Sequence, residues 1–500
     1  MKFFFQIIAI LHCATIATAQ CEDFNLGFGV NGVAQVSMAS GSITEIMNNS
    51  FLDADDGIVC VGYSFTNVHD AMAISFQKAD GTINGEVGGD GKIIYAVGED
   101  NYGSVGMLTS EGKYLIAGNW SFFFNEQYKF RQLLPDGSPD DSFGVNGEVY
   151  PFLQESVIQQ TRGISQDATG NIIGTGIARV FNTDWLVYMK LSKSGEELIE
   201  PKRITLPGVS SFVSGKQLRY KNEVLVTGEA LVGAQTKGAI VKLTGEGELD
   251  PVFGLSGTVH APISDGRPSK VVNVFSPDDE TIIAVGYHLG VDKNTLFMLS
   301  LDSKGDRTSD FFDEGYSLID IDKNSHPVDF MMNGDDIYIA VNNQSTSKGE
   351  IYKANTQGEL INDFGENGIF PLGTGDSEKL ARIHLNSEND IIVTGISDQD
   401  FTVWSLHTCM DVSVESENIN EEINLYPNPA AAQINLDFGK ATQVDEIMIL
   451  DIYGNTINTL GLDGIIRESI MIDVNNLPMG MYFMQVKNQN QILVSTFIKI

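Results

Sequence analysis

The glycine pattern GFGVNG at residues 27–32 has the G-x-G-x-x-G spacing that binds dinucleotide phosphates. A dinucleotide site requires these glycines between a strand and a helix. Here the pattern is one copy of a repeated turn, and the sister copies SFGVNG and DFGENG lack the first glycine. We therefore expect no nucleotide cofactor.

The acidic cluster DADDG at residues 53–57 combines carboxylates with a glycine, as calcium-binding loops do. Its acids lack the full alternating spacing of such a loop. Acidic pairs precede the same kind of strand at 278–279 and 335–336. We interpret the cluster as a solvated turn and expect no metal.

No spacing in the chain identifies a catalytic residue. There is no H-x-x-x-H pair, G-x-S-x-G, Walker-type loop or C-x-x-C. Paired carboxylates need only two acids ~5–9 Å apart, and with 66 acidic residues that chemistry stays open. The six histidines beyond the N-terminal apolar run are scattered: His69, His260, His288, His326, His384 and His407.

An aromatic segment is the one candidate for ligand binding. Trp120, Phe122, Phe123 and Phe124 lie in a segment whose counterparts differ between repeats. Variable loops on a repeating scaffold are the usual place for binding. These side chains could form a platform for a sugar or a peptide. The alternative is that they only extend a strand and pack within the fold.

A repeat organises most of the chain. The stretch LLPDGSPDDSFGVNG (133–147) returns at 22–32, 79–91, 193–208, 247–257, 304–315 and 358–368, which makes seven copies. A second landmark, a short apolar run that ends in glycine in six of seven cases, recurs every 52–58 residues. It ends at Gly62, Gly118, Gly176, Gly228, Gly286, Val341 and Gly395.

Each repeat predicts three or four antiparallel strands, because β-branched and aromatic runs alternate with Gly, Asp, Asn and Pro clusters. Runs such as IIVTG are apolar on both faces, so neighbouring sheets must stack, and a closed ring leaves only short edges. The sequence thus predicts an all-β, seven-bladed β-propeller over residues 20–409. A parallel β-solenoid is the alternative, although its repeats are usually shorter than ~30 residues.

The repeat motif itself has turn chemistry. Asp136-Gly137 and Asn146-Gly147 supply residues that tolerate positive φ at tight reversals. We expect Phe143, between these turns, to pack the connection into the core. The motif resembles the delta-sixty repeat, a bacterial family of β-propeller units, over residues 22–408. The resemblance implies a fold and no functional residue.

The N-terminus predicts a secretory signal peptide over residues 1–19. Lys2 precedes an apolar run that ends in the small residues Ala17-Thr18-Ala19. A membrane anchor is the alternative, but the run is shorter than the ~20 residues that a span needs. A lipoprotein reading of Cys21 is weaker, because Gln20 is a poor residue before a lipidated cysteine.

Two cysteines flank the repeats and predict a disulfide. A closed ring brings its first and last sheets together, so Cys21 and Cys409 would become neighbours in an oxidising compartment. In the chain-entropy model, closing so long a loop contributes ~5 kcal/mol or somewhat more, which is an upper figure because native strain and residual structure in the unfolded chain reduce it. Cys60, inside a strand, is expected to be a buried free thiol.

A different pattern follows the acidic linker 410–424. Residues 425–500 predict a small all-β domain, an Ig-like sandwich with a hairpin turn at 488–490. LYPNP, DIYGN, LPMGMY and the terminal Lys499-Ile500 resemble the type A C-terminal sorting domain of the type IX secretion system; an ordinary Ig-like domain is the alternative. The motif residues are Leu425, Tyr426, Pro427, Asn428, Pro429, Tyr453, Gly454, Leu477, Gly480, Tyr482 and Lys499.

Composition agrees with export. The net charge of −35 becomes −36 once Lys2 leaves with the signal, and such a surface repels phosphate backbones and anionic lipids. The resemblance implies partnership with the type IX machinery and an extracellular or cell-surface location reached through the periplasm. We expect no membrane span in the mature chain. We expect a binding or scaffold protein for a glycan or protein; a hydrolase or lyase using channel carboxylates is the alternative.

Overall fold

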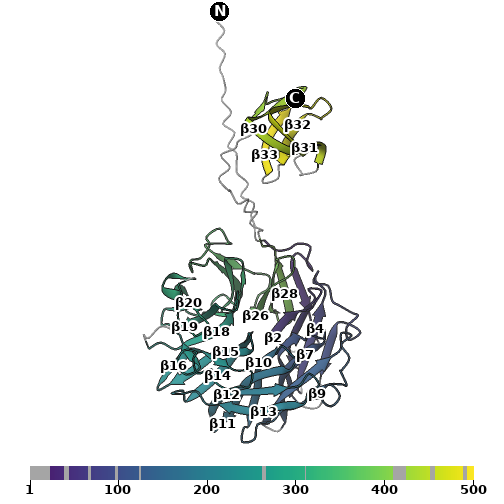
Figure 1. The fold of residues 1–500 in the computed structure, drawn as a ribbon. Helices are drawn as coiled ribbons and strands as arrows, with labels where there is room; N and C mark the ends of the chain where they lie inside the picture. Colours follow the sequence, from purple (N-terminus) through teal and green to yellow (C-terminus); the bar gives the residue numbers. More distant parts are fainter. Residues whose placement is uncertain are drawn as a thin grey trace, which may run out of the picture. The chain divides into compact units, whose positions relative to one another are not determined.

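A computed structural model describes residues 23–38, 44–65, 69–95, 100–122, 125–261, 266–309, 311–408, 424–450, 456–487 and 492–500 (Figure 1). Contacts divide the chain into two compact units, Met1–Cys409 and Met410–Ile500. The signal segment, both flanking cysteines, residues 410–423 and the turn at 488–490 lie outside the described residues.

The first unit is built from antiparallel sheets of four strands, and seven such sheets lie within its described residues. The prediction of an all-β fold is confirmed. The sheets, from the first strand outward, are β2–β5 (Thr44–Leu52, Ile58–Phe65, Asp70–Gln77, Lys92–Tyr95), β6–β9 (Asp100–Leu108, Tyr114–Phe122, Asn125–Leu133, Glu148–Val149), β10–β13 (Ile158–Gln166, Ile172–Val180, Thr183–Leu191, Glu197–Ile204), β14–β17 (Ser211–Tyr220, Glu223–Val232, Gln235–Leu243, Thr258–His260), β18–β21 (Ser269–Phe275, Ile282–His288, Lys293–Leu301, Tyr316–Asp322), β22–β25 (Ser325–Asn333, Asp336–Asn343, Lys348–Ala354, Ile369–Pro371) and β26–β28 (Glu378–Leu385, Ile391–Ser397, Asp400–Leu406) with β1 (Val33–Val36). A 3-10 turn, η1 (Asp313–Gly315), precedes β21.

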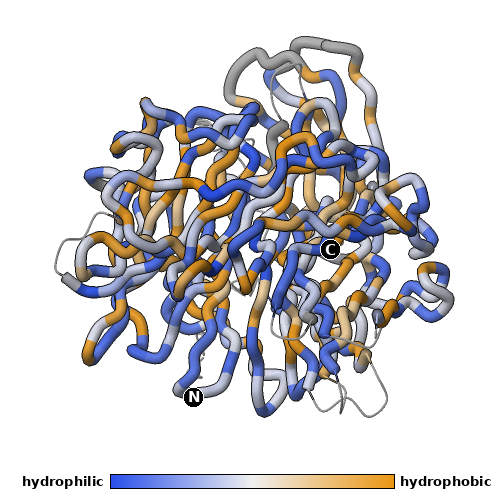
Figure 2. Tube along the Cα trace, turned by 90° about the horizontal axis from the view of Figure 1, so that it is seen from below, coloured by the Kyte–Doolittle hydropathy of each residue, from blue (hydrophilic) through white to orange (hydrophobic). Residues whose placement is uncertain are grey.

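The sheets follow one another around a ring. The first strand of each sheet packs against the first strand of the next, and β26 packs against β2. A separate buried apolar cluster fills each junction between neighbouring sheets. In Figure 2, hydrophobic stretches run through the sheets and hydrophilic ones are frequent in the loops. Apolar side chains on both faces of each sheet are thereby removed from water.

The N-terminal strand completes the last sheet. β1 pairs antiparallel with β28, with Val33 opposite Trp404 and Val36 opposite Phe401. The first strand of the repeat region thus becomes the outer strand of a sheet whose other strands end at Leu406. Hydrogen bonding between the two ends of the repeat region therefore closes the ring, and we did not predict this strand exchange.

The repeat motif links neighbouring sheets. The backbone N–H of Gly144 donates to Ser194 O of the following sheet at 2.8 Å, and Gly254 donates in the same way to Lys304 O at 2.7 Å. Phe143 is fully buried beneath this contact, as predicted, and its counterpart Phe253 is too. In the repeated Phe-Gly pair, the phenylalanine thus fills the core and the glycine N–H forms a hydrogen bond to the next sheet.

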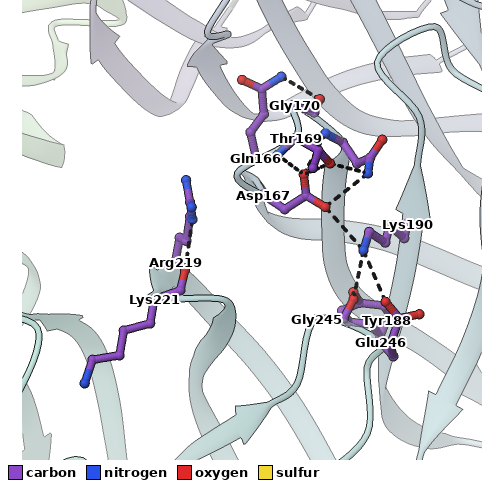
Figure 3. Close-up of polar contacts among 11 residues, drawn as sticks. Gln166, Asp167, Thr169, Gly170, Tyr188, Lys190, Arg219, Lys221, Gly245 and Glu246 are labelled. Atoms are coloured by element: carbon purple, nitrogen blue, oxygen red, sulfur yellow. Dashed lines mark hydrogen bonds and ion pairs between the residues drawn. The ribbon is translucent and has the colours of Figure 1, made fainter.

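Polar side chains add further links between sheets. Figure 3 shows Lys190 on β12, whose Nζ lies 3.2 Å from Asp167 Oδ2 and 3.2 Å from Gly245 O. Tyr188 OH donates to the same carbonyl at 2.6 Å. Asp167 also accepts the backbone N–H of Thr169 at 2.9 Å. The turn after β10 is therefore held to the turn after β16, one sheet further on.

The strands by which neighbouring sheets pack together are called the inner strands: β2, β6, β10, β14, β18, β22 and β26. Within the residues described, a β-bulge interrupts each of these seven strands at a matching height. The extra residues are Asn48, Ser104, Arg162, Gly215 with Lys216, Val272, Val328 and Ala381. A bulge re-aims the side chains around it. In six of the seven sheets the residue opposite the bulge is the glycine that ends the repeated apolar run. In the remaining sheet, β22–β25, Val341 takes its place.

The glycine is needed there because the bulge pushes a carbonyl oxygen toward its Cα. A Cβ on Gly118 would overlap Tyr102 O, and one on Gly62 would overlap Ile46 O. We expect Gly118→Ala to lower the free energy of unfolding by about 3 kcal/mol, the upper end for overpacking in a rigid site. Urea denaturation would measure this. Gly112→Ala, where a Cβ meets nothing within 4 Å although φ is +73°, is the control for backbone strain and should cost less; an equal loss would contradict the bulge argument.

The second unit is a single hydrogen-bonded sheet of five strands, β29 (Asn424–Tyr426), β30 (Gln433–Leu450), β31 (Thr456–Asp473), β32 (Gly480–Lys487) and β33 (Ile492–Lys499). β30 pairs with β29, β31 and β32, and β33 pairs with β32. Its core contains Ile434, Ile447, Met484 and Phe497. No helix in the described part of the chain has the length and hydropathy required to cross a bilayer.

Candidate functional site

A cavity of about 530 Å³ lies where the seven inner strands meet. Each strand contributes three or four consecutive residues at or just after its bulge. The lining segments are Asn49–Leu52, Val105–Met107, Arg162–Ile164, Lys216–Leu218, Asn273–Phe275, Asp329–Met332 and Arg382–Leu385. The volume falls within the range of small-molecule sites, ~300–1,000 Å³. The bulges therefore determine which side chains line this cavity.

Among the described residues, Asp329 on β22 is the only acidic one in the lining, and it is 1% exposed. Its Oδ1 accepts from Asn273 Nδ2 at 2.6 Å and lies 2.8 Å from Lys216 Nζ. Its Oδ2 accepts the backbone N–H of Ile383 at 3.1 Å and lies 3.3 Å from Arg382 Nε. Burial alone would raise the pKa of Asp329, but Arg382 and Lys216 outweigh it and lower the pKa to about 2. Asp329 is therefore a charged, fully engaged carboxylate.

Lys216 connects sheets that are not neighbours. Its side chain extends from the bulge of β14 to Asp329 and to the carbonyl of Val328 on β22. Lys216 therefore links two sheets that have the β18 sheet between them. Burial, together with the charge of Arg382, lowers the pKa of Lys216 to about 7, although Asp329 opposes the shift. Its side chain keeps 21% exposure, which is provided by the cavity. The ammonium thus changes charge near neutral pH.

The polar lining also includes two arginines and a histidine. Arg382 Nε is buried and makes no hydrogen bond to the described residues, since its approach to Asp329 has an ion-pair distance without hydrogen-bond geometry. Arg162, on β10, is exposed to the cavity. His384 Nε2 lies 2.7 Å from Ser50 Oγ, and burial and then Arg382 lower the pKa of His384 to about 3. His384 is therefore neutral at physiological pH.

The charge balance of the cavity is opposite to that of the chain. Arg162, Lys216 and Arg382 face one carboxylate, Asp329, in a protein whose net charge is −35. Such an arrangement can hold an anionic group, because guanidinium and ammonium groups form their strongest hydrogen bonds with oxyanions. It does not contain the two acids that paired-carboxylate catalysis uses.

The predicted aromatic platform is only partly described. Trp120 is half-buried and its ring packs edge-on against Tyr150, with centroids 5.8 Å apart. The side chain of Phe122 and the whole of Phe123 and Phe124 lie outside the described residues. The structure therefore places one of the four residues, and places it against its own sheet.

The acidic turn at 53–57 satisfies its own backbone. Asp53 Oδ1 accepts the N–H groups of Asp55 at 2.9 Å and of Gly57 at 2.7 Å. Among the described residues there is no group of three or more His, Cys, Asp or Glu side chains able to hold a metal. Cys60 is a buried free thiol as predicted, and burial raises its pKa to about 12.

The cavity residues were not predicted from the sequence. Lys216, Asp329 and Arg382 occur in unrelated local contexts and are separated by 113 and 53 positions. The signal that could have found them is the repeated glycine, since each one marks the height of the bulge on the preceding strand. Aligning the repeats on that glycine would have placed these residues in one belt.

The motif residues of the second unit cluster at its last strand. Asn428 Nδ2 donates to Thr496 O at 3.0 Å, and Asn428 Oδ1 accepts from Ile498 N at 2.9 Å. Tyr482 stacks on Phe497 with centroids 5.6 Å apart and donates to Pro478 O at 3.0 Å. Lys499 Nζ donates to Ile500 O at 2.6 Å. Leu425 and Leu477 pack against the core, Gly480 begins β32, and the bonds before Pro427 and Pro429 are cis; Tyr453 and Gly454 lie outside the described residues.

The second unit matches a known protein family. Residues 424–500 match the family described as "Secretion system C-terminal sorting domain". The predicted type IX sorting domain is confirmed at these residues, and it indicates export to the cell surface or the extracellular space and interaction with the secretion machinery.

The repeat region is similar to solved structures only at a distance. A structure of "polysaccharide lyase Uly1" is 9% identical, with a TM-score of 0.43, over 76% of this chain and 93% of that one. "Drosophila Semaphorin 2a" is 8% identical, with a TM-score of 0.46, over 93% of this chain and 98% of that one. Similarities this low carry no argument about function. No curated protein matches the sequence.

Proposed function

We propose that this chain is an exported seven-bladed β-propeller that binds a ligand in its central cavity, as a recognition or scaffold protein of the cell surface or medium. The observation that carries the proposal is the belt of polar side chains around a 530 Å³ cavity, contributed by six of the seven inner strands, while β6 contributes Val105, Gly106 and Met107. Binding sites combine apolar walls with a few converging polar groups, and this cavity has Phe51, Met107 and Phe330 beside its charged residues.

A carboxylate-based hydrolase is less well supported. Such an enzyme needs a proton donor and a second acid ~5–9 Å away. Within the part of the chain that the structure describes, Asp329 is the only acid in the cavity lining, and its low pKa keeps it from donating a proton at neutral pH. A ligand that binds without turnover is the outcome we favour.

The remaining elements of the proposal follow from sequence. They are removal of residues 1–19 as a signal peptide, delta-sixty character for residues 22–408, a Cys21–Cys409 disulfide, an acidic linker over 410–424 and an Ig-like sandwich for 425–500. A second contact, with a glycan or protein, would use Trp120 and Phe122–Phe124.

Export is tested by deleting residues 424–500. The truncated chain should accumulate in the periplasm, because it would lack the sorting domain that the secretion machinery recognises. Immunoblots of periplasm, cell surface and medium would follow both forms. Equal export of the truncated chain would contradict the proposal. Leu460→Ala, at an exposed side chain of β31, is the control for general damage to this unit.

Ligand binding is tested on the purified mature protein. A saccharide and peptide array would be probed with the wild type, Trp120→Ala and Lys216→Met, and product formation would be followed in parallel. We expect retention on a ligand, weakened by Lys216→Met and without turnover. Retention lost only with Trp120→Ala would move the site to the loops, and steady product formation would favour the enzyme alternative.

A further inference from the structure

We propose that the central cavity recognises a single oxyanion, a carboxylate or sulfate carried by a small acidic saccharide, on Lys216 and Arg382. This inference rests on the proposed binding function and specifies its ligand class. In this arrangement Asp329 and Asn273 are positioning residues that hold the two cations, while the ligand occupies the open side of the cavity.

The two cationic donors, Lys216 and Arg382, are held in place by Asp329. Asp329 is bound on both oxygens by partners from three other strands, β14, β18 and β26. It therefore fixes Lys216 and Arg382 with their stems on different sheets and their charges within reach of one carboxylate. A preorganised pair of cations loses little side-chain freedom when a ligand binds.

Arg382 and Lys216 keep N–H donors that the described residues do not use. In the described part of the chain, the side chain of Arg382 has one polar partner, Asp329, which lies 3.3 Å from its Nε. Its two Nη atoms make no hydrogen bond to these residues. Lys216 donates to Asp329 and to Val328 O, which leaves one of its three N–H bonds. The remaining donors suit an oxyanion, and a guanidinium can bind one in bidentate fashion.

The charge of the cavity and of the chain around it favours a small ligand with a single negative charge. Asp329 alone cannot neutralise both Arg382 and a protonated Lys216, and Arg162 is a third cation in the lining, so the described lining carries an excess of positive charge inside a chain of net charge −35. The acidic exterior repels long polyanions, whereas a small molecule with one charge avoids most of that repulsion. A hydroxyl-rich ring also suits the polar groups of Asn49, Ser50 and His384, which line the same cavity. These features favour an acidic sugar over a nucleic acid.

Proton uptake by Lys216 gives the site a second readout. Lys216 faces Asp329 on β22 and Arg382 and His384 on β26; Lys270 on β18 lowers its pKa more weakly, and Arg162 lines the same cavity. A bound anion favours the charged ammonium. Binding should therefore weaken as the pH rises from 6 to 8.5 and should be accompanied by proton uptake near neutral pH.

The test is calorimetric titration of the mature protein with defined probes. Galacturonate carries a carboxylate, galactose 6-sulfate carries a sulfate, and galactose is the neutral match; an aspartate dipeptide offers a carboxylate without a sugar. Lys216→Met should weaken binding of an acidic sugar about 10- to 100-fold, the range for a lost hydrogen bond to a charged group. Lys216→Arg should restore most of it. Lys221→Met, at a lysine outside the cavity that pairs with Glu280, should leave binding unchanged.

The outcomes distinguish failure of the oxyanion site from failure of the broader binding function. Binding of galactose as tightly as galacturonate, with no effect of Lys216→Met, would overturn the oxyanion site and leave a binding propeller. Equal binding of the dipeptide would overturn the saccharide assignment. Absence of binding by every probe, together with no sulfate-specific rise in Tm over chloride at equal ionic strength, would overturn the oxyanion site, and the array decides the broader function separately. The Tm comparison uses the wild type alone, so it holds even if Lys216→Met folds poorly.

Discussion

Asp329→Asn is expected to lower the free energy of unfolding by about 3 kcal/mol at pH 6, because removing one partner of a buried ion pair leaves the other charges uncompensated. Lys216 and Arg382 would both lose their carboxylate while staying largely enclosed, with 21% and 24% of their side chains exposed. Asparagine keeps the size of the side chain and its carbonyl oxygen, so the loss reports charge rather than a cavity.

The pH dependence of this loss has a defined sign. The pKa of Asp329 is lowered to about 2 in the folded state, so its stabilisation is present above pH ~4 and disappears as the pH falls toward 2. The pKa of Lys216 is about 7, so above that pH the amine can be neutral and less in need of a partner. The difference between wild type and Asp329→Asn should thus be largest near pH 5–6 and smaller at pH 2 and pH 9.

Urea denaturation at these three pH values would measure it. Glu280→Gln is the control, because Glu280 pairs with Lys221 at the surface with 71% exposure and such pairs contribute ~0–1 kcal/mol. A loss for Asp329→Asn that is independent of pH, or no greater than the control, would mean that the ion network does not organise the cavity.

Phe143→Ala is expected to lower the free energy of unfolding by about 3–5 kcal/mol, the usual cost of truncating a buried phenylalanine. Phe143 is fully buried in the cluster between the β6 and β10 sheets. It directly precedes Gly144, whose N–H bridges to Ser194 O. The loss should therefore include weaker coupling between two sheets as well as lost apolar burial.

Val145→Ala supplies the matched control in the same turn. Val145 is 75% exposed, and surface substitutions of this kind usually change stability by no more than ~0.5 kcal/mol. Denaturation of the two variants, with hydrogen exchange to locate the opening, would separate them. Similar losses would show that the turn as a whole, rather than the buried ring, joins the sheets.

The position of the cationic cavity gives a chain of strongly acidic composition a local preference for anions. The net charge of −35 describes the surface and argues against extended polyanions. The interior belt obeys different electrostatics, because charges in a protein interior interact more strongly than in water. The net charge of the whole chain therefore does not give the sign of the charge in the cavity that the inner strands form.

The repeat pattern predicted much of the fold, since its physics is local. Asp-Gly and Asn-Gly turns, apolar runs and the buried Phe143 all appear where the pattern places them. The sorting-domain motif was also readable, because its landmarks have fixed order and spacing. The exchange of β1 into the last sheet was missed, since pairing between Val33 and Trp404 joins residues hundreds of positions apart.

By itself the sequence determined an all-β chain of repeated sheets, the turns that connect them and the C-terminal sorting domain, because each depends on neighbouring residues and on burial of apolar faces. Only the tertiary structure decided the candidate site. Lys216, Asp329 and Arg382 meet because three separate inner strands bulge at one height around a common axis. Ion pairing across that axis depends on the closed ring, and no local pattern encodes such a distance.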